Sequence, residues 1–289
     1  MLRFFERWLH GLYMYGAAGI AVFGWALCWL LGWDAERWMP QWVLGALLVY
    51  NADRLSKDPA DVFNVPLRTA GRRELRKVRL LLMVVAAGGL VIVPWIEGDW
   101  RTLAAVIVGA PVCLSYSRAL LGMRFKEVPV LKTFFAPTIV LCSVVGLPLL
   151  HGAAVPSGLR FWGSLAWAWA FLLFNMVVCD WRDRVGDAEA GVVSLPMRLG
   201  DAGTRVLLMV LAAGCAGGAF GAAVWGPGPL RGAYGLLGVW TAIYLGALLR
   251  LLGRVRSERF YEWWVEGMLF VPGLALGPVA LGWWVGVAG

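Results

Sequence analysis

Long apolar runs alternate with short polar stretches along almost the whole chain. Because about 20 apolar residues are needed to cross the hydrocarbon core of a bilayer, each sufficiently long run predicts one membrane-spanning helix. Nine runs meet this condition, at residues 11–31, 38–55, 78–97, 101–121, 131–150, 160–180, 204–226, 233–253 and 265–287. The run 38–55 is the weakest, because its apolar part stops at Asn51 and Asp53. The pattern predicts an all-α fold, a polytopic membrane bundle of nine transmembrane helices that forms a single domain over residues 1–289.

Lys and Arg residues are distributed unevenly between the loops. If the N-terminus is cytoplasmic, only Arg37, Arg101, Arg160 and Arg231 fall on the outer side, which leaves 22 of the 26 basic residues inside. Cytoplasmic loops of membrane proteins carry such an excess of positive charge. Adding or removing one span would move every later loop to the other side, so the asymmetry also supports nine spans. We therefore expect a cell inner-membrane protein with a cytoplasmic N-terminus.

The composition agrees with a membrane protein and argues against other classes. The chain is 60% hydrophobic and only 15% charged, which is more apolar than a typical soluble domain. A formal net charge of +8 is compatible with nucleic-acid binding, but no basic stripe with interleaved aromatic residues lies outside the apolar runs. We expect membrane lipid and no nucleic acid as partners. The sequence predicts no particular oligomeric state.

Aspartates are concentrated after two of the nine runs. Six of the nine aspartates follow the second and the sixth run: Asp53, Asp58 and Asp61, then Asp180, Asp183 and Asp187. Both clusters lie on the predicted cytoplasmic side, and both contain the dipeptide Asp-Arg. The two Asp-Arg pairs are 130 residues and four spans apart. This spacing predicts an internal repeat, in which two four-helix units are followed by one additional helix.

The second cluster has the pattern of a cation site. Asp183 and Asp187 are four residues apart, so on a helix they share one face. Two carboxylates held this close repel each other unless a cation lies between them. Mg²⁺ takes oxygen ligands and is commonly bound by one or two carboxylates together with the phosphates of a substrate. Acids at a helix end can also simply face water, but two clusters at matched positions favour a phosphate-bearing substrate held through metal ions.

Two segments resemble a known family. The segment "DWRDRVGDAEAGVVSLPMRLG" resembles the second aspartate motif of the UbiA-type intramembrane prenyltransferase superfamily, in which two acids four apart are followed by Gly, Ser or Thr, Leu-Pro and Leu-Gly. The segment "SYSRALLGMRFKEVPVLK", residues 115–132, is similar to that family's Tyr-Ser, Lys, Pro and Lys segment. Nine helices and acids on the inner side also agree with the family, so the resemblance covers nearly the whole chain.

The first acidic cluster departs from the family pattern. The family carries Asn-Asp and then two further aspartates at spacings of three and four. Aligned on the Asp-Arg dipeptide, these places hold Val49, Tyr50, Asp53 and Lys57. Asp58 and Asp61 lie close enough to substitute if the helix is interrupted, and the amide oxygen of Asn51 is a further possible ligand. Lys57 could instead contact a diphosphate directly as a point charge.

The resemblance implies a set of site residues and a cofactor. It implies Mg²⁺ bound by Asp53, Asp180, Asp183 and Asp187, of which Asp53, Asp183 and Asp187 would be catalytic. Basic side chains that would bind phosphate oxygens are Arg54, Lys126, Lys132 and Arg184, and further substrate contacts would come from Asn51, Lys57 and Tyr116.

The implied activity is transfer of an isoprenoid chain from a prenyl diphosphate to a lipophilic acceptor, aromatic or a quinone precursor, within the membrane. Two alternatives stay open at this point. One is a terpene cyclase of the same superfamily, in which the ionised chain attacks itself. The other is a non-catalytic carrier of lipid phosphates on the same scaffold. The sequence defines neither the length of the prenyl chain nor the acceptor.

Overall fold

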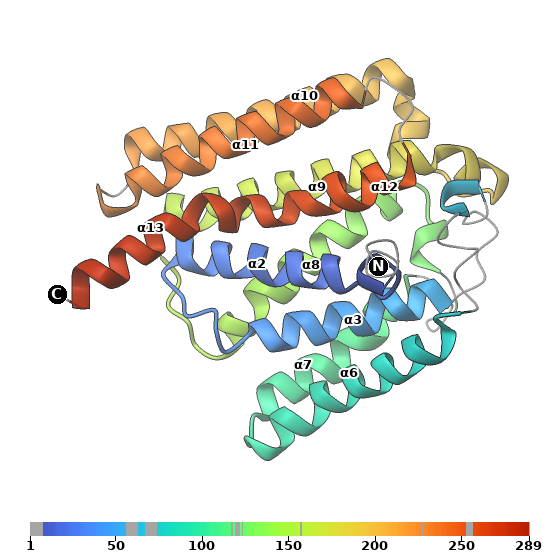
Figure 1. Cartoon of the computed structure of the whole chain (residues 1–289), viewed down its shortest axis with the longest axis horizontal. Coiled ribbons are helices and arrows are strands. Elements are labelled where there is room, and N and C mark those ends of the chain that lie inside the picture. Colours follow the sequence, from blue (N-terminus) through green and yellow to red (C-terminus); the bar gives the residue numbers. More distant parts are fainter. Residues whose placement is uncertain are drawn as a thin grey trace.

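The structure is a computed structural model, and it is a bundle of helices that run along one common direction (Figure 1). It describes residues 8–55, 63–66, 74–116, 118, 122, 124–156, 158–226, 228–252 and 257–288, and their side chains except those of 229 and 282–288. Every regular element within these ranges is helical. The main helices are α2 (Met14–Leu31), α3 (Met39–Leu55), α6 (Arg76–Ile96), α7 (Trp100–Leu114), α8 (Leu131–Leu150), α9 (Gly158–Glu189), α10 (Leu195–Trp225), α11 (Arg231–Leu251) and α13 (Val271–Ala288).

The predicted membrane bundle is confirmed, but the count of nine spans is not. Each of the nine predicted runs contains a helix, although α7 ends at Leu114, before the end of the run 101–121. Among the described residues, seven helical stretches are long and apolar enough to cross a membrane: α2, α6, α8, α9, α10, α11 and the stretch Glu258–Leu281. The remaining two helices are shorter, since α3 has 17 residues and α7 has 15. In α3 the apolar stretch is shorter still, because Asn51, Asp53 and Arg54 lie near its end.

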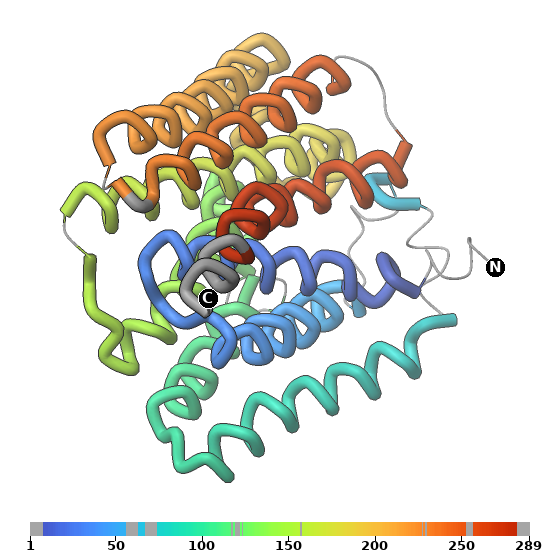
Figure 2. The backbone as a smooth tube through the Cα atoms, turned by 60° about the vertical axis from the view of Figure 1, so that its left-hand side comes forward, coloured from blue at the N-terminus to red at the C-terminus, as the bar shows by residue number. Residues whose placement is uncertain are grey.

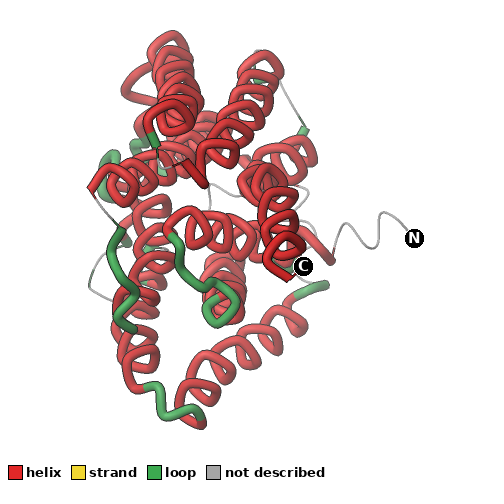
Figure 3. Tube along the Cα trace, turned by 90° about the vertical axis from the view of Figure 1, so that its left-hand side faces the viewer, coloured by secondary structure: helices red, strands yellow, loops and turns green. Residues whose placement is uncertain are grey.

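The helices pack in three layers. The hairpin of α10 and α11 lies on one side and the hairpin of α6 and α7 on the other, with α2, α3, α8, α9 and α13 between them (Figures 1 and 3). In Figure 1 helix α13 ends at the far left of the bundle. Fully buried aromatic side chains of the central layer, such as Phe23, Phe171 and Phe174, form the core. By contrast, α6 and α7 expose apolar side chains such as Val84 and Val108, as expected for surfaces that face lipid.

Neighbouring helices pack in a similar way around α3 and α9. α3 packs against α2 and α6, and α9 packs against α8 and α10. Figure 2 shows the hairpins α6–α7 and α10–α11 on opposite sides of the central helices. This arrangement is the one expected for two related four-helix units, although the repeat itself stays a prediction.

The last membrane-spanning stretch is irregular where it begins. The short helix α12 (Glu258–Phe260) leads into the π-helical segment η3 (Tyr261–Val265) and the 3-10 segment η4 (Glu266–Phe270) before α13. Three side chains from other helices donate to successive carbonyl groups of η3: Tyr15 to Trp263 at 3.4 Å, Tyr244 to Trp264 at 2.6 Å and Asn175 to Val265 at 2.6 Å. These bonds satisfy carbonyl groups that a π-helix presents outside the regular helical pattern.

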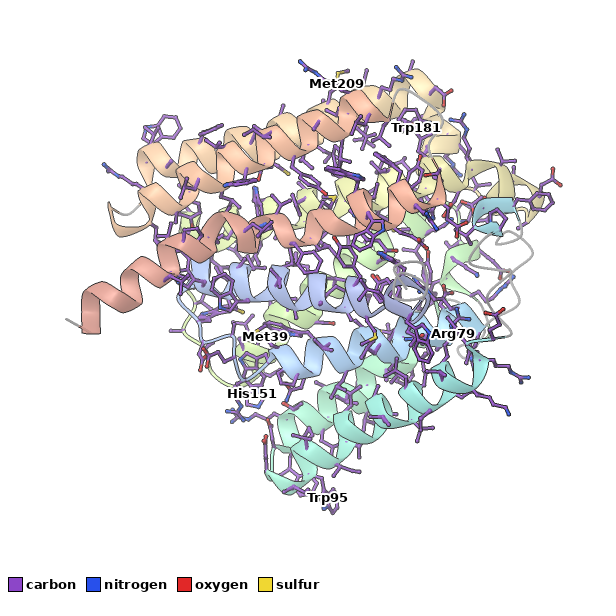
Figure 4. The ribbon with its side chains drawn as sticks, in the orientation of Figure 1. Met39, Arg79, Trp95, His151, Trp181 and Met209 are labelled. Atoms are coloured by element: carbon purple, nitrogen blue, oxygen red, sulfur yellow. The ribbon has the colours of Figure 1, made fainter. Side chains whose placement is uncertain are left out.

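The two ends of the bundle differ in chemistry. One end, called the motif end below, carries Asp53, Tyr116 and Asp187, and the opposite end carries Arg37, Asp99 and His151. Figure 4 shows Arg79 and Trp181 toward the motif end and Met39 and His151 toward the opposite end. The acidic residues predicted to act together therefore lie at one end of the bundle.

Candidate functional site

The three aspartates of the second cluster lie on α9, because this helix continues past the predicted end at residue 180 to Glu189. Asp180 and Asp187 are buried, with 0% and 3% of their surfaces exposed. They share one cation: the Lys132 Nζ lies 2.5 Å from Asp187 Oδ2 and 3.4 Å from Asp180 Oδ1. Thr133 Oγ1 donates to Asp180 Oδ2 at 2.5 Å. The structure thus brings Lys132 to the second cluster, and its predicted contact with phosphate stays a prediction.

The start of α8 is fixed directly against the second cluster. Val130, which precedes α8, has a left-handed backbone with φ of 68°, an unfavourable conformation for a β-branched residue. Its amide donates to Val193 O at 2.9 Å, and the Leu195 amide donates to Thr133 Oγ1 at 3.2 Å. These bonds hold Lys132 and Thr133 over the carboxylates of α9.

The other residues of the motif shape the backbone after α9. Gly191, with φ of 71°, closes the helix in a Schellman arrangement, because Val192 N donates to Asp187 O at 2.8 Å and Gly191 N to Ala188 O at 3.1 Å. Pro196 lies in the first turn of α10, where a missing amide hydrogen costs nothing. Gly200 breaks α10 with φ of 66°. Within a few residues the chain therefore leaves α9, contacts the start of α8 and begins α10.

Asp183 is held by its neighbour in sequence. Arg182 donates to it through Nε at 2.5 Å and Nη2 at 3.0 Å, a two-bond geometry that orients the carboxylate. The Arg182 guanidinium also lies 5.0 Å from the centre of the Tyr261 ring. Asp183 is half-buried, so it lies closer to the surface than Asp180 and Asp187.

Two predicted residues of the first cluster bind the segment just before α2. Asn51 is fully buried, and its Nδ2 donates to Leu12 O and Leu47 O, both at 2.8 Å. Arg54 is 6% exposed; its Nη1 donates to His10 O, and its Nη2 lies 3.9 Å from Glu266 Oε1 in η4. The roles of both side chains as substrate contacts stay predictions.

Tyr116 lies between the two clusters. Burial raises the pKa of its phenol well above the usual value, and the negative charges of Asp180, Asp53 and Asp187 raise it further. Tyr116 lines the same cavity as Asp53. Its ring stacks on Phe135 with centroids 5.4 Å apart, and Phe135 lies two residues after Thr133, which bonds Asp180. The structure thus brings Asp53 and the second cluster to the same residue.

Lys126 and Asn64 also join segments that are distant in sequence. Lys126 is 7% exposed. It lies next to Tyr116, because its amide donates to Tyr116 O at 3.3 Å. Asn64 Oδ1 accepts a hydrogen bond of 3.0 Å from the amide of Gly186, inside the second motif. Sequence reasoning missed Asn64 and Thr133. Thr133 could have been found from its place directly after Lys132, whereas Asn64 gave no such signal.

For two of the predicted substrate residues, the contact with this site stays a prediction. Arg184 forms an ion pair with Asp201, which also accepts a 2.8 Å hydrogen bond from Trp181 Nε1. This pair is exposed. Lys57, together with Asp58 and Asp61, lies outside the described residues.

An apolar cavity of about 390 Å³ begins beside Asp53 and Tyr116 and extends along the bundle to Gln41 and Leu150. Its walls are mainly α3, α7 and α8. The lining is almost entirely apolar and includes Trp42, Gly45, Tyr50, Ala105, Gly109, Phe135, Gly146 and Leu147. A long apolar slot with carboxylates and a lysine at one end suits a ligand with an apolar chain and a charged head.

The donor set suits a hard cation. Asp180, Asp183 and Asp187 offer only carboxylate oxygens, the ligands that Mg²⁺ prefers, and a positive charge, the Lys132 ammonium, already lies between two of them. Among the residues that the structure describes, no three His, Cys, Asp or Glu side chains converge as a complete ligand set. Further ligands would therefore have to come from the substrate's phosphates and from water.

Comparison with known proteins identifies the family. Residues 60–271, well over half of the chain, match the UbiA prenyltransferase family. This stretch includes the whole second cluster and Lys132 but begins after Asp53. No curated protein and no solved structure matches the chain. Together with the polytopic helical bundle, the match shows that the chain belongs to the UbiA prenyltransferase family of integral-membrane proteins.

Proposed function

We propose that the protein transfers an isoprenoid chain from a prenyl diphosphate to a lipophilic, aromatic or quinone-precursor acceptor within the membrane. The observation that supports this most strongly is the apolar cavity that ends at Asp53 and Tyr116, beside carboxylates that share the Lys132 ammonium. The diphosphate would lie at the motif end and the chain in the cavity. We further propose that the motif end faces the cytoplasm.

The proposed roles of the basic residues follow from charge. When the bond between the allylic carbon and the diphosphate oxygen breaks, both electrons go to the diphosphate, whose negative charge grows. Lys132 can exchange Asp187 for a phosphate oxygen, and the buried Lys126 is a further cation at this end. Fixed cations that face developing negative charge lower the barrier of such a step.

Asp53, Asp180, Asp183 and Asp187 are the proposed holders of Mg²⁺. When bound, Mg²⁺ neutralises the departing diphosphate as a Lewis acid. The protein's own contribution is to keep the carboxylates on one helix face and to orient Asp183 through Arg182. Mg²⁺ and Lys132 would together neutralise these buried carboxylates, whose charge would otherwise be costly to bury.

The cavity would protect the allylic cation until the acceptor captures it. Water is excluded by the apolar lining, which prevents capture by hydroxide or water. Tyr50, Tyr116 and Phe135 lie at or near the mouth, where aromatic faces can stabilise a cation. The acceptor supplies the electron pair for the new bond and loses its proton afterwards.

The activity can be tested with purified protein in lipid nanodiscs, a prenyl diphosphate, Mg²⁺ and an aromatic acceptor. We expect prenylated acceptor and one diphosphate per product, and we expect Asp187→Asn to lower the rate by at least about 100-fold, as for loss of a group that stabilises the transition state. Asp201→Asn is the matched control, because Asp201 is an exposed carboxylate at the same end. A wild-type rate for Asp187→Asn would contradict the proposal, and a cyclised hydrocarbon formed without acceptor would identify a terpene cyclase instead.

A further inference from the structure

The length of the cavity can be estimated separately along each of its three helical walls. The cavity is lined by α3 from Gln41 to Asp53, by α7 and the following turn from Ala105 to Tyr116, and by α8 from Phe135 to Leu150. At 1.5 Å per residue these stretches are roughly 18, 16 and 22 Å long. The three walls therefore agree on a slot of roughly 16 to 22 Å.

A polar cluster at the opposite end of the bundle ties the three walls together, and we call it the Asp99 cluster (Arg37, Asp99, Thr102 and His151). Asp99 caps α7, and it accepts hydrogen bonds from the Thr102 amide at 3.0 Å, from Arg37 Nη2 at 3.1 Å and from His151 Nε2 at 2.8 Å. Arg37 precedes α3, and His151 directly follows α8. Each wall thus contributes to the cluster just beyond the point at which the cavity ends.

The Asp99 cluster is rigid in two further ways. His151 Nδ1 lies 2.9 Å from Leu147 O, so both ring nitrogens face acceptors, and its ring packs against Trp38 with centroids 4.5 Å apart. Arg101 adds a second link between α7 and α8 by donating to Leu150 O at 3.1 Å. The last lining residues, Gln41 and Leu150, are therefore held in place from outside the cavity.

Three glycines, one on each wall, keep the slot open. They are Gly45 on α3, Gly109 on α7 and Gly146 on α8, and all three line the cavity. A Cβ built on any of them would meet no atom within 4 Å. Larger side chains at these positions would fill the slot at defined depths: roughly 10 Å from the mouth for Gly109, counted from Tyr116, and roughly 16 Å for Gly146, counted from Phe135.

The length of the slot can be converted into a number of isoprene units. An extended covalent chain advances about 1.2 Å per backbone bond, as a polypeptide does. One isoprene unit adds four such bonds, or about 5 Å. A slot of roughly 16 to 22 Å therefore holds three or four units, with the first carbon at Asp53 and Tyr116.

We infer that the donor is a prenyl diphosphate of three or four isoprene units, and that Gln41, Leu147 and Leu150, held by the Asp99 cluster, set this limit. The inference rests on the proposed function. A longer chain would have to displace this end of the cavity or leave the slot between α7 and α8, and either route loses apolar contact with the walls. A chain of two units would leave the far part of the slot empty and bind more weakly.

The test compares diphosphates of two, three, four, six and nine isoprene units in nanodiscs with Mg²⁺ and one acceptor. We expect kcat/KM to be highest for three and four units and at least about tenfold lower for six and nine. Gly109→Leu should move the optimum to two units, and Gly146→Leu should disfavour four units relative to three. Gly214→Leu is the control, because Gly214 is exposed on α10, away from the cavity, and also has no atom within 4 Å of a Cβ.

The outcomes separate the two proposals. Efficient use of six and nine units by the wild-type protein would overturn the inferred length while leaving the transferase function intact. So would a length profile that neither Gly109→Leu nor Gly146→Leu changes. If no diphosphate of any length is turned over, the proposed function fails and the inferred substrate fails with it. If a glycine variant fails to fold, the series of chain lengths measured with the wild-type protein still tests the inferred length.

Discussion

At the scale of single residues, the most informative contact is the ammonium group that Asp180 and Asp187 share. The sequence indicated that Asp183 and Asp187 need a cation, and the resemblance to the family named Lys132 as a phosphate contact; the structure places Lys132 between Asp180 and Asp187. Thr133, whose hydroxyl bonds Asp180, was not named, although it directly follows Lys132. Arg184 pairs with Asp201, and its role as a substrate contact stays a prediction.

Replacing Lys132 by Met should strongly destabilise the protein. The substitution keeps the length of the side chain but removes the ammonium group that the two buried carboxylates share; breaking a buried ion pair typically costs about 3–5 kcal/mol. The measurement is the free energy of unfolding in detergent, with Arg124→Met as the control. Arg124 pairs with Glu127 in the same loop, and 35% and 45% of the two side chains are accessible, so its loss should cost less than about 1 kcal/mol.

The double variant Lys132→Met with Asp187→Asn checks the cause. It removes a cation and a carboxylate together, so part of the lost stability should return. Equal stability of Lys132→Met and Arg124→Met would mean that Lys132 does not neutralise the buried carboxylates.

At the scale of elements, the apolar pattern predicted where helices lie better than where they end. All nine runs contain a helix, but α9 and α10 extend beyond their apolar runs because polar residues continue them. Those extensions carry the site: Asp183 and Asp187 lie in the part of α9 that hydropathy alone would assign to a loop. The Asp99 cluster could not be predicted either, since Arg37, Asp99 and His151 come from three different connections.

Asp99→Asn should test the cluster that holds the three cavity walls together. Asn still caps α7 but loses the charge that Arg37 and His151 contact. Although burial alone would raise the pKa of Asp99, hydrogen bonds from Thr102 and His151 hold it well below its usual value. At neutral pH the variant should therefore lose about 1–3 kcal/mol of unfolding free energy, the range for hydrogen bonds to a charged group.

The pH dependence of this difference has a definite sign. A carboxyl whose pKa is lowered by folding stabilises the folded state above its unfolded pKa of about 3.9, and this contribution is lost as the pH falls further. The stability difference between wild type and Asp99→Asn should thus be constant from pH 7 to about pH 5 and shrink below about pH 4. A difference that grows on acidification would contradict the role given to Asp99. Thermal unfolding in detergent at each pH provides the measurement.

At the scale of the whole molecule, the proposed function requires that the segment around Asp53 and the second cluster meet at one end of the cavity. The sequence predicted a membrane bundle with its aspartates gathered at one end, and both expectations agree with the helical bundle and the family match. The cavity could not be predicted, because its walls come from α3, α7 and α8 and its width depends on three scattered glycines. The apolar pattern indicates which segments form membrane helices, but it does not determine where neighbouring helices leave a cavity between them.

A photoaffinity experiment tests the central claim, that the isoprenoid chain lies in this cavity with its diphosphate at the motif end. The probe is a prenyl diphosphate of four units with a photoreactive group at the far end of the chain, cross-linked in nanodiscs and mapped by mass spectrometry. The account predicts labelling on α3 near Gln41 and on α8 near Gly146 and Leu150, abolished by an excess of unlabelled prenyl diphosphate. Labelling spread over the lipid-facing hairpin of α10 and α11, or labelling that unlabelled diphosphate does not reduce, would contradict it.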